Sequence, residues 1–358
     1  MNTTHRIIFG ASQQMSSIPS QSVQLVVTSP PYPMIAMWDE QFSTQDPAIA
    51  EALRQKPYVA YEQMHQLLDI VWQNCYRVLS PGGILCINIG DATRSINGQF
   101  AIYTNHSRIT SACERIGFSS LPGIIWRKVN NQPNKFMGSG MLPCGAYISL
   151  EHEHILIFRK GEKRAYSDPD TQATRNASAY FWEERNRWFS DVWEIPGVEQ
   201  RLTTEDARSR SAAYPLEIPY RLIQMYSIQG DTVLDPFLGT GTTQLAAMVS
   251  FRNSIGFELD TNLRNTVQQQ FSHLRVDDAN AYIKKRFDQH MRFVKERESA
   301  GKPLKYFHNR WKMKVMTGQE TAITWQWLKA IEFKPMQSLY NVHYTPMNNP
   351  RELPFFMR

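Results

Sequence analysis

The stretch that decides the fold is TVLDPFLGTGTTQLAAM, residues 232–248. Its apolar start at residues 232–234 predicts a buried strand, and residues 244–248 begin a helix. Between them, Gly239 and Gly241 permit tight turns and remove side-chain bulk. In α/β folds, a strand, a glycine loop and a helix in this order let the backbone approach a nucleotide-like ligand. The stretch lacks the Gly-Lys-Ser/Thr ending of a phosphate-binding P-loop, and it is not the full GxGxxG dinucleotide fingerprint.

A second short strand, predicted at residues 255–260, carries the acid Glu258. Glu258 lies 17 residues after Gly241, near the place where doubly wound folds put an acid that accepts hydrogen bonds from ribose hydroxyls. A solvated acid at a strand end is the alternative for Glu258 alone. Behind a glycine loop without a phosphate-binding device, the acid points to a nucleoside cofactor, and S-adenosylmethionine fits better than NAD.

The second informative motif is Thr28-Ser29-Pro30-Pro31-Tyr32, which follows an apolar run at residues 23–27. The run predicts a buried strand, and the two prolines end it because neither donates to a sheet ladder. A hydroxyl, two rigid carbonyls and an aromatic ring therefore stand at the edge where open α/β sheets bind ligands. Such a set suits a flat base with an exocyclic amino group. An ordinary loop is the alternative when the motif is considered alone.

Composition is that of an ordinary soluble globular protein, with 358 residues, 42% hydrophobic and 20% charged. No apolar run approaches the roughly 20 residues that cross a bilayer, and the N-terminus lacks the apolar core of a signal peptide. We therefore expect a cytoplasmic protein without a membrane partner. The four cysteines lack CxxC spacing, which favours reduced thiols over a metal site. His152 and His154 alternate with Glu151 and Glu153 on an apparent strand, and we interpret them as structural rather than as metal ligands.

Positive charge is concentrated toward the C-terminus. Residues 261–358 contain 17 Lys and Arg against 8 Asp and Glu, whereas the preceding residues contain 22 against 25. This distribution, interleaved with aromatic residues, favours a polyanion partner such as nucleic acid. A solvated basic face is the alternative. The candidate DNA-contacting residues are Lys284, Lys285, Arg286, Arg292, Lys305, Arg310, Trp311 and Lys312.

Helix and strand patterns alternate along most of the chain. Helices are predicted at residues 61–79 and 105–116, and strands at 5–10 and 84–89, which favours a mostly parallel sheet. The polar stretch at 160–210, rich in Arg, Trp and Tyr, is either an inserted recognition segment or a connection packed on the sheet.

Several segments, taken in order, resemble the DNA amino-methyltransferases of the β class, in which the catalytic motif precedes the cofactor motif. The resemblance covers about residues 5–275. It implies a Rossmann-like fold that binds S-adenosyl-L-methionine, without a metal. The segments that carry it are residues 28–32, 77–83, 125–130, 153–160, 213–219, 235–243 and Glu258.

The resemblance also implies site residues. Those of the catalytic motif are Ser29, Pro30, Pro31 and Tyr32. The cofactor-binding residues that it implies are Tyr214, Pro215, Asp235, Pro236, Phe237, Gly239, Thr240, Gly241, Thr242 and Glu258.

The implied reaction is direct transfer of the sulfonium methyl group to an exocyclic amino nitrogen of a flipped base in double-stranded DNA. Ser29 and the Pro30 carbonyl would accept hydrogen bonds from the amino group, Tyr32 would stack on the base, and Asp91 is a plausible neighbour. In this family a serine at the head of the motif is more usual for cytosine N4, with adenine N6 as the alternative. A companion restriction endonuclease is a further expectation.

Two other readings of the sequence stay open. One is a DNA-binding subunit that holds the cofactor without catalysis, and the other is a methyltransferase for RNA or for a protein glutamine. We expect four parts along the chain: a catalytic half at 1–160, a candidate target-recognition insertion at 161–210, a cofactor half at 211–275 and a basic DNA-binding region at 276–358.

Overall fold

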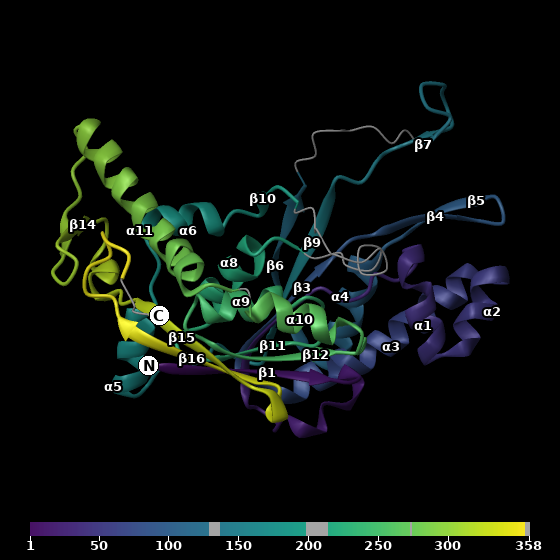
Figure 1. Ribbon diagram of the computed structural model, residues 1–358. Helices are drawn as coiled ribbons and strands as arrows, with labels where there is room; N and C mark the ends of the chain where they lie inside the picture. Colours follow the sequence, from purple (N-terminus) through teal and green to yellow (C-terminus); the bar gives the residue numbers. More distant parts are fainter. Residues whose placement is uncertain (129–136, 198–213, 273, 355–358) are drawn as a thin grey trace.

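A computed structural model describes residues 1–128, 137–197, 214–272 and 274–354. Its centre is a ten-stranded sheet in the order β10-β6-β9-β3-β2-β11-β12-β1-β16-β15 (Figure 1). The bounds of these strands are β1 Asn2–Phe9, β2 Val23–Thr28, β3 Leu79–Ile89, β6 Phe118–Arg127, β9 His152–Lys160, β10 Val192–Glu194, β11 Thr232–Asp235, β12 Asn253–Glu258, β15 Gln326–Lys334 and β16 Leu339–Pro346.

Within this sheet only β9 and β16 run against the other strands, because each pairs antiparallel with both of its neighbours. The five pairs made by β10, β6, β3, β2, β11, β12 and β1 among themselves are parallel. The predicted mostly parallel α/β sheet is confirmed. Since parallel strands end at one edge, the loops after β2, β3, β11 and β12 meet there.

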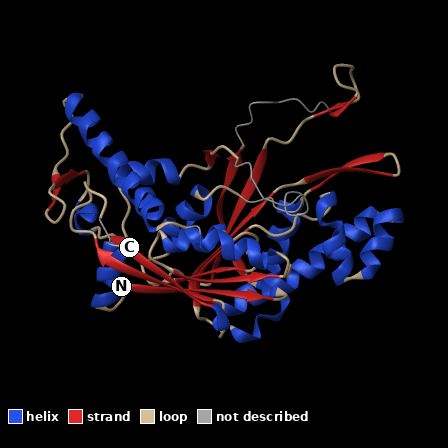
Figure 2. Ribbon diagram, in the orientation of Figure 1, coloured by secondary structure: helices blue, strands red, loops and turns tan. Residues whose placement is uncertain are grey.

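Helices cover both faces of the sheet (Figure 2). Strand β2 shows why both faces are apolar: Leu25 and Val27 belong to one core cluster and Val26 to the other. A parallel strand buried on both faces has a continuous apolar run rather than an alternating one. The helices are α1 Asp39–Gln45, α2 Pro47–Gln55, α3 Pro57–Val78, α4 Asn105–Ile116, α5 Pro169–Ala177, α6 Trp182–Trp188, α8 Glu217–Tyr226, α9 Thr242–Met248, α10 Leu263–Ser272 and α11 Val276–Ser299.

Short elements complete the described chain. Two hairpins, β4–β5 and β7–β8, project from the body of the molecule (Figure 2). A stacked ring pair, Phe100 with Tyr147 at 4.2 Å between centroids, joins them. The bounds are β4 Ala92–Ile96, β5 Gln99–Tyr103, β7 Met137–Gly138, β8 Ala146–Tyr147, β13 Tyr306–His308, β14 Met313–Val315, and the 3₁₀ turns η1 Ser12–Ser17, η2 Ala36–Trp38, η3 Gly318–Ala322 and η4 Pro335–Gln337.

The helices predicted at residues 61–79 and 105–116 end within one residue of the expected positions. Helix α4 ends at Gly117, whose φ of 114° is left-handed and whose N–H donates to the carbonyls of Cys113 and Glu114. Helix α3 ends at Val78, and the Ser-Pro-Gly-Gly segment at residues 80–83 belongs to the start of β3. The register between β2 and β3 shifts there, which accommodates the proline at the edge of the ladder.

The expected boundary at residues 275/276 does not divide the fold. Strand β16 pairs with β1 along residues 2–6, so the C-terminal region completes the central sheet. Helix α11 is tied to β15 by a pair of hydrogen bonds between the Asn280 amide and the backbone of Leu328, each 2.8 Å. The basic region is therefore part of the same body as the central sheet.

The polar stretch after residue 160 packs on this body as far as the structure describes it. Strand β10 extends the sheet beside β6, and Trp188 and Trp193 are buried. Residues 161–197 therefore include segments packed on the sheet, while residues 198–210 of the expected insertion lie outside the described residues. No helix in the described part of the chain is long and apolar enough to cross a membrane.

Candidate active site

Three neighbouring strands deliver the two predicted motifs to one cavity. Strand β11 pairs with β2 on one side and β12 on the other, so the segments that follow them leave the same edge of the sheet. They line a cavity of about 450 Å³. The predicted residues that line it are Ser29, Pro30, Pro31, Tyr32, Tyr214, Asp235, Pro236, Phe237, Gly239, Thr240, Thr242 and Glu258.

Two predicted cofactor residues do not line the cavity. Pro215 lies just before α8, where its carbonyl accepts the N–H of Ile218. Gly241 lies behind the loop with φ of 90°, and a Cβ there would stand 2.7 Å from the Phe271 ring. Gly241 is therefore required by both backbone conformation and space, which makes it a structural support of the loop rather than a cavity wall.

Glu258 closes the glycine loop from the end of β12. Its carboxylate accepts the N–H of Gly239 and the N–H of Asp260, each at 2.8 Å. Burial raises the pKa of Glu258 to about 7, against the opposing effect of those two N–H groups. A buried carboxylate on the wall of a cavity, with lone pairs left over, can accept hydroxyl hydrogens from a ribose.

Asp235 joins the two motifs. Its carboxylate accepts hydrogen bonds from the Thr28 hydroxyl and the Thr243 hydroxyl at 2.6 Å, and from the Phe237 N–H at 3.0 Å. The Tyr214 hydroxyl lies 2.5 Å from that of Thr243. Burial raises the pKa of Asp235 to about 6 although these donors favour the carboxylate. The residue before Ser29 is thus fixed directly to the first residue of the glycine loop.

Tyr32 is held at both its ring and its hydroxyl. A Cβ on Gly90 would lie 3.0 Å from the ring, so glycine at that position leaves space for it. The hydroxyl donates to Glu153 at 2.8 Å, accepts from the Asn88 amide at 2.9 Å and lies 3.1 Å from the Ser29 hydroxyl. Burial, and then the Glu153 charge, raises the pKa of Tyr32 well above its ordinary value. The phenol therefore keeps its proton.

Sequence reasoning assigned no site role to Asn88, Glu153 or Lys128. The structure brings Asn88 and Glu153 to the Tyr32 hydroxyl, and Lys128 to Glu153. Asn88 interrupts the apolar run of β3, and Glu153 is a buried acid on β9 that also forms an ion pair with Lys128. A polar residue inside a buried strand run is the signal that points to Asn88. For Glu153 the available signal is weaker, because acids at strand starts are commonly solvated.

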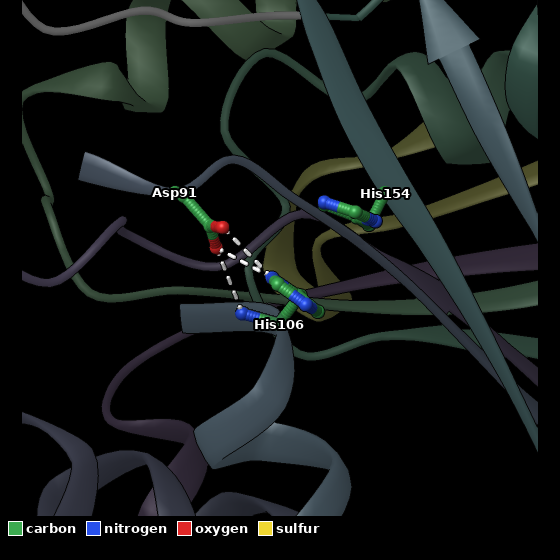
Figure 3. Close-up of side chains that lie close together, drawn as sticks. All are labelled: Asp91, His106 and His154. Carbon is green, nitrogen blue, oxygen red and sulfur yellow. Dashed lines mark hydrogen bonds and ion pairs between the residues drawn. The ribbon is translucent and has the colours of Figure 1, made fainter. Parts of the chain in front are cut away.

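A second polar cluster consists of Asp91, His106 and His154 (Figure 3). Both Asp91 carboxylate oxygens lie 2.8 Å from Nδ1 of His106, and the rings of His106 and His154 stack at 4.0 Å with 18° between their planes. Imidazole lone pairs lie in the ring plane, so two nearly parallel rings do not aim at one common ion. The geometry is that of an imidazole hydrogen-bonded to a carboxylate, with a stacked neighbour. Asp91 is engaged by His106 rather than by the catalytic motif.

The candidate DNA-contacting residues divide into two groups. The prediction is wrong for Arg286 and Trp311, which are 6% and 1% exposed. Arg286 forms a two-pronged ion pair with Glu184, both bonds 2.6 Å, and the Trp311 indole donates to the Met347 carbonyl. Lys284 is half-buried and pairs with Asp288. The exposed members are Lys285, Arg292, Lys305, Arg310 and Lys312.

The family model described as DNA methylase matches residues 23–269, which include both motifs of the cavity. The chain belongs to this DNA methylase family. It is 48% identical over 326 residues to the type II methyltransferase M.MthZI of Methanothermobacter thermautotrophicus, covering 90% of each chain. It is 52% identical over 282 residues to the type II methyltransferase M.MjaI of Methanocaldococcus jannaschii, covering 75% of this chain and 92% of that one.

Solved structures resemble this DNA methylase in fold. The protein TTHA0409 of Thermus thermophilus, solved in complex with S-adenosyl-L-methionine, is 32% identical with a TM-score of 0.58, over 75% of this chain and 95% of its own. The PvuII DNA methyltransferase, described as cytosine-N4-specific, is 19% identical with a TM-score of 0.50, over 80% and 94%. The second likeness concerns the fold alone. The predicted Rossmann-like methyltransferase fold is confirmed.

Proposed function

We propose that this protein is a type II, sequence-specific DNA methyltransferase that transfers a methyl group from S-adenosyl-L-methionine to the N4 amino group of a cytosine in double-stranded DNA. The observation that carries the proposal is the single cavity lined by both Ser29-Pro30-Pro31-Tyr32 and the glycine loop with Glu258. A donor and an acceptor bound there would lie against adjacent strands of one rigid sheet. Positioning of two reactants is the main physical demand of a direct transfer.

The cofactor end of the cavity fits a nucleoside. Glu258 offers a carboxylate for ribose hydroxyls, and Gly239 carries no side chain to block a close approach. S-adenosylmethionine, when bound, supplies an electrophilic methyl group on a sulfonium. Asp235, Pro236, Phe237, Thr240, Thr242 and Tyr214 are the further residues that we assign to its binding.

At the other end of the cavity, Ser29 and the Pro30 carbonyl are assigned to accept hydrogen bonds from the amino group of the target base. Positive charge develops on the amino nitrogen as the methyl group arrives, and oxygen dipoles stabilise it there. The Tyr32 ring is assigned to stack on the base. A base in a duplex stack cannot bring its amino nitrogen into line with the methyl group, so the base must be extruded into the cavity.

The choice of cytosine rests on Ser29. A neutral serine hydroxyl opens the motif, where an aspartate or asparagine is more usual in relatives that methylate adenine N6. Cytosine is also the smaller base. The β-class order of the motifs, with residues 28–32 before residues 235–243, is part of the same proposal.

For DNA contact we propose the exposed basic residues Lys285, Arg292, Lys305, Arg310 and Lys312. Cations of this kind contact phosphates and set register without reading bases. A restriction endonuclease acting on the same site is the partner that a type II methyltransferase of this kind would have.

The test is incubation of the full chain with labelled S-adenosylmethionine and mixed-sequence duplex DNA, followed by nucleoside analysis. We expect labelled N4-methylcytosine. Label found only in N6-methyladenine would reject the base assignment while leaving the class of enzyme intact. Binding of the cofactor without transfer to any DNA would instead support the non-catalytic DNA-binding subunit. Competition between duplex DNA and RNA or protein acceptors distinguishes a DNA methyltransferase from one that acts on RNA or on a protein glutamine.

A further inference from the structure

A buried carboxylate stands directly behind the catalytic motif. Glu153 is 8% exposed and comes from β9, the strand that runs against its neighbours beside β3. Its Oε2 accepts from the Tyr32 hydroxyl at 2.8 Å and from the Asn88 amide at 2.6 Å, and its Oε1 pairs with Lys128. Burying a carboxylate is costly unless it is fully hydrogen-bonded, and here each oxygen has a partner. Such a group controls the direction of the hydrogen bonds around it.

The available donors determine which of the Glu153, Tyr32 and Ser29 oxygens donates and which accepts in each hydrogen bond. An ionised carboxylate only accepts, so the single proton of the Tyr32 hydroxyl points to Glu153. The Asn88 amide N–H can only donate, and it is directed at the same phenol oxygen. The remaining contact of that oxygen, 3.1 Å from Ser29, must therefore be a hydrogen bond donated by the Ser29 hydroxyl.

This direction matters for Ser29. Because its proton is committed to Tyr32, Ser29 presents lone pairs elsewhere: one has the Asn88 amide at 3.5 Å, and the hydroxyl also lines the cavity. A hydroxyl whose proton faced the cavity would repel the amino hydrogens of a base and would compete for its lone pair. The orientation of the Asn88 amide is fixed by the same carboxylate, although its own Oδ1 finds no partner among the described residues.

We propose that Glu153 is a positioning residue for methyl transfer: by holding the Tyr32 proton it turns the Ser29 hydroxyl into a hydrogen-bond acceptor toward the target amino group. The inference rests on the proposed function, in which Ser29 accepts from that amino group. Glu153 itself does not touch the base. It acts through the chain Ser29 to Tyr32 to Glu153.

A purely structural role would be neutralisation of Lys128. The two roles differ in what the Tyr32 hydroxyl does. Tyr32→Phe keeps the ring for stacking, the Glu153–Lys128 ion pair and the Asn88–Glu153 hydrogen bond. It removes the phenol oxygen, and with it the link between Ser29 and Glu153 and the contact with Asn88. Glu153→Gln removes the charge, so that a weaker, neutral acceptor faces the phenol proton and the ion pair with Lys128 is lost.

The experiment is a double-mutant cycle of Tyr32→Phe and Glu153→Gln, with kcat for DNA methylation, the Kd for S-adenosylmethionine and the thermal midpoint measured for each variant. We expect each single variant to lower kcat about 10- to 100-fold, as for loss of a hydrogen bond to a charged group. In the Tyr32→Phe background, Glu153→Gln should cost less than about 3-fold more, because the chain is already broken. The Kd should change less than about 2-fold.

The matched control is Glu151→Gln, which removes a carboxylate two residues away that is 48% exposed and has no contact with Tyr32 among the described interactions. It should keep wild-type kcat. If Glu153→Gln fails to fold, Tyr32→Phe alone decides, and an unchanged kcat in that variant overturns the inference. Fully multiplicative losses in the cycle also overturn it. If the wild-type protein methylates no DNA, the proposed function is rejected. Failure of the proposed function is therefore distinguishable from failure of the Glu153 inference, which requires an active wild-type protein.

Discussion

The Thr28 hydroxyl donates a 2.6 Å hydrogen bond to the carboxylate of Asp235, a residue 207 positions later in the chain. Thr28 directly precedes the catalytic motif, and Asp235 opens the glycine loop. The bond lies between adjacent parallel strands and is fully buried. It fixes the acceptor half of the cavity relative to the cofactor half.

Thr28→Val removes this donor while keeping the branched shape. Because Asp235 then loses one of its three donors in a buried position, we expect the free energy of unfolding to fall by about 1–3 kcal/mol. Thr28→Ser restores the hydroxyl and should recover most of the loss. Chemical denaturation measures both, and equal stability of the Val and Ser variants would contradict the role of this bond.

Glu258 predicts a pH dependence of cofactor binding. Burial raises its pKa from 4.5 to about 7, and the ionised form is the better acceptor for ribose hydroxyls. The Kd for S-adenosylmethionine should therefore tighten up to about ten-fold between pH 6 and pH 8, as the ionised fraction rises. Titration calorimetry across this range checks it. Glu258→Gln should bind more weakly and show no such dependence.

The same shift has the opposite consequence for the protein without cofactor. A carboxyl group with a folded pKa above its unfolded value favours the fold in its protonated form, so this contribution is complete below about pH 4.5 and is lost as pH rises through about 7. The difference in stability between Glu258→Gln and wild type should therefore shift in favour of the variant over that window. A constant difference across the window would show that Glu258 titrates normally.

Gly241 and Gly239 form a matched pair for testing the loop. Both have positive φ, 90° and 54°, but only at Gly241 would a Cβ meet a neighbour, the Phe271 ring at 2.7 Å. Gly239→Ala should cost about 1 kcal/mol for backbone conformation alone. Gly241→Ala should cost more and weaken binding of S-adenosylmethionine, with partial recovery in combination with Phe271→Leu. Thermal melts and calorimetry distinguish the two, and equal costs would place the strain elsewhere.

Arg286 and Lys285 are neighbours on α11, but one is buried and the other exposed. Substituting each in turn distinguishes a structural role from DNA contact. Arg286→Ala leaves Glu184 buried and unpaired, so it should destabilise the protein by about 3–5 kcal/mol. Lys285→Ala should leave stability unchanged and lower the salt dependence of DNA binding by roughly one ion. Binding measured at several salt concentrations, together with denaturation, checks both. A stable Arg286→Ala protein with weakened DNA binding would return Arg286 to the DNA-contacting group.

Local patterns in the sequence were sufficient where structure is set locally. The apolar runs before Ser29, before the glycine loop and around Glu258 predicted three parallel strands. Parallel strands end at the same edge of a sheet, so the residues that follow them were expected to lie close together. The Arg286 and Trp311 predictions failed because charge and aromatic content do not reveal which face of a helix or turn is covered. Glu153 was missed since its partners, Tyr32 and Asn88, come from two other segments of the chain and no spacing encodes that meeting.

The pairing of β1 with β12 on one side and β16 on the other has a consequence for how the chain is made. Strand β1 is synthesised before both of its neighbours, which begin at residues 253 and 339. At about 5–20 residues per second, the first strand waits roughly 20–70 seconds before its second edge can be covered. A chain stopped short of residue 339 would keep an open strand edge, which is a template for aggregation. Synthesis of β16 is therefore the step that covers the second edge of β1.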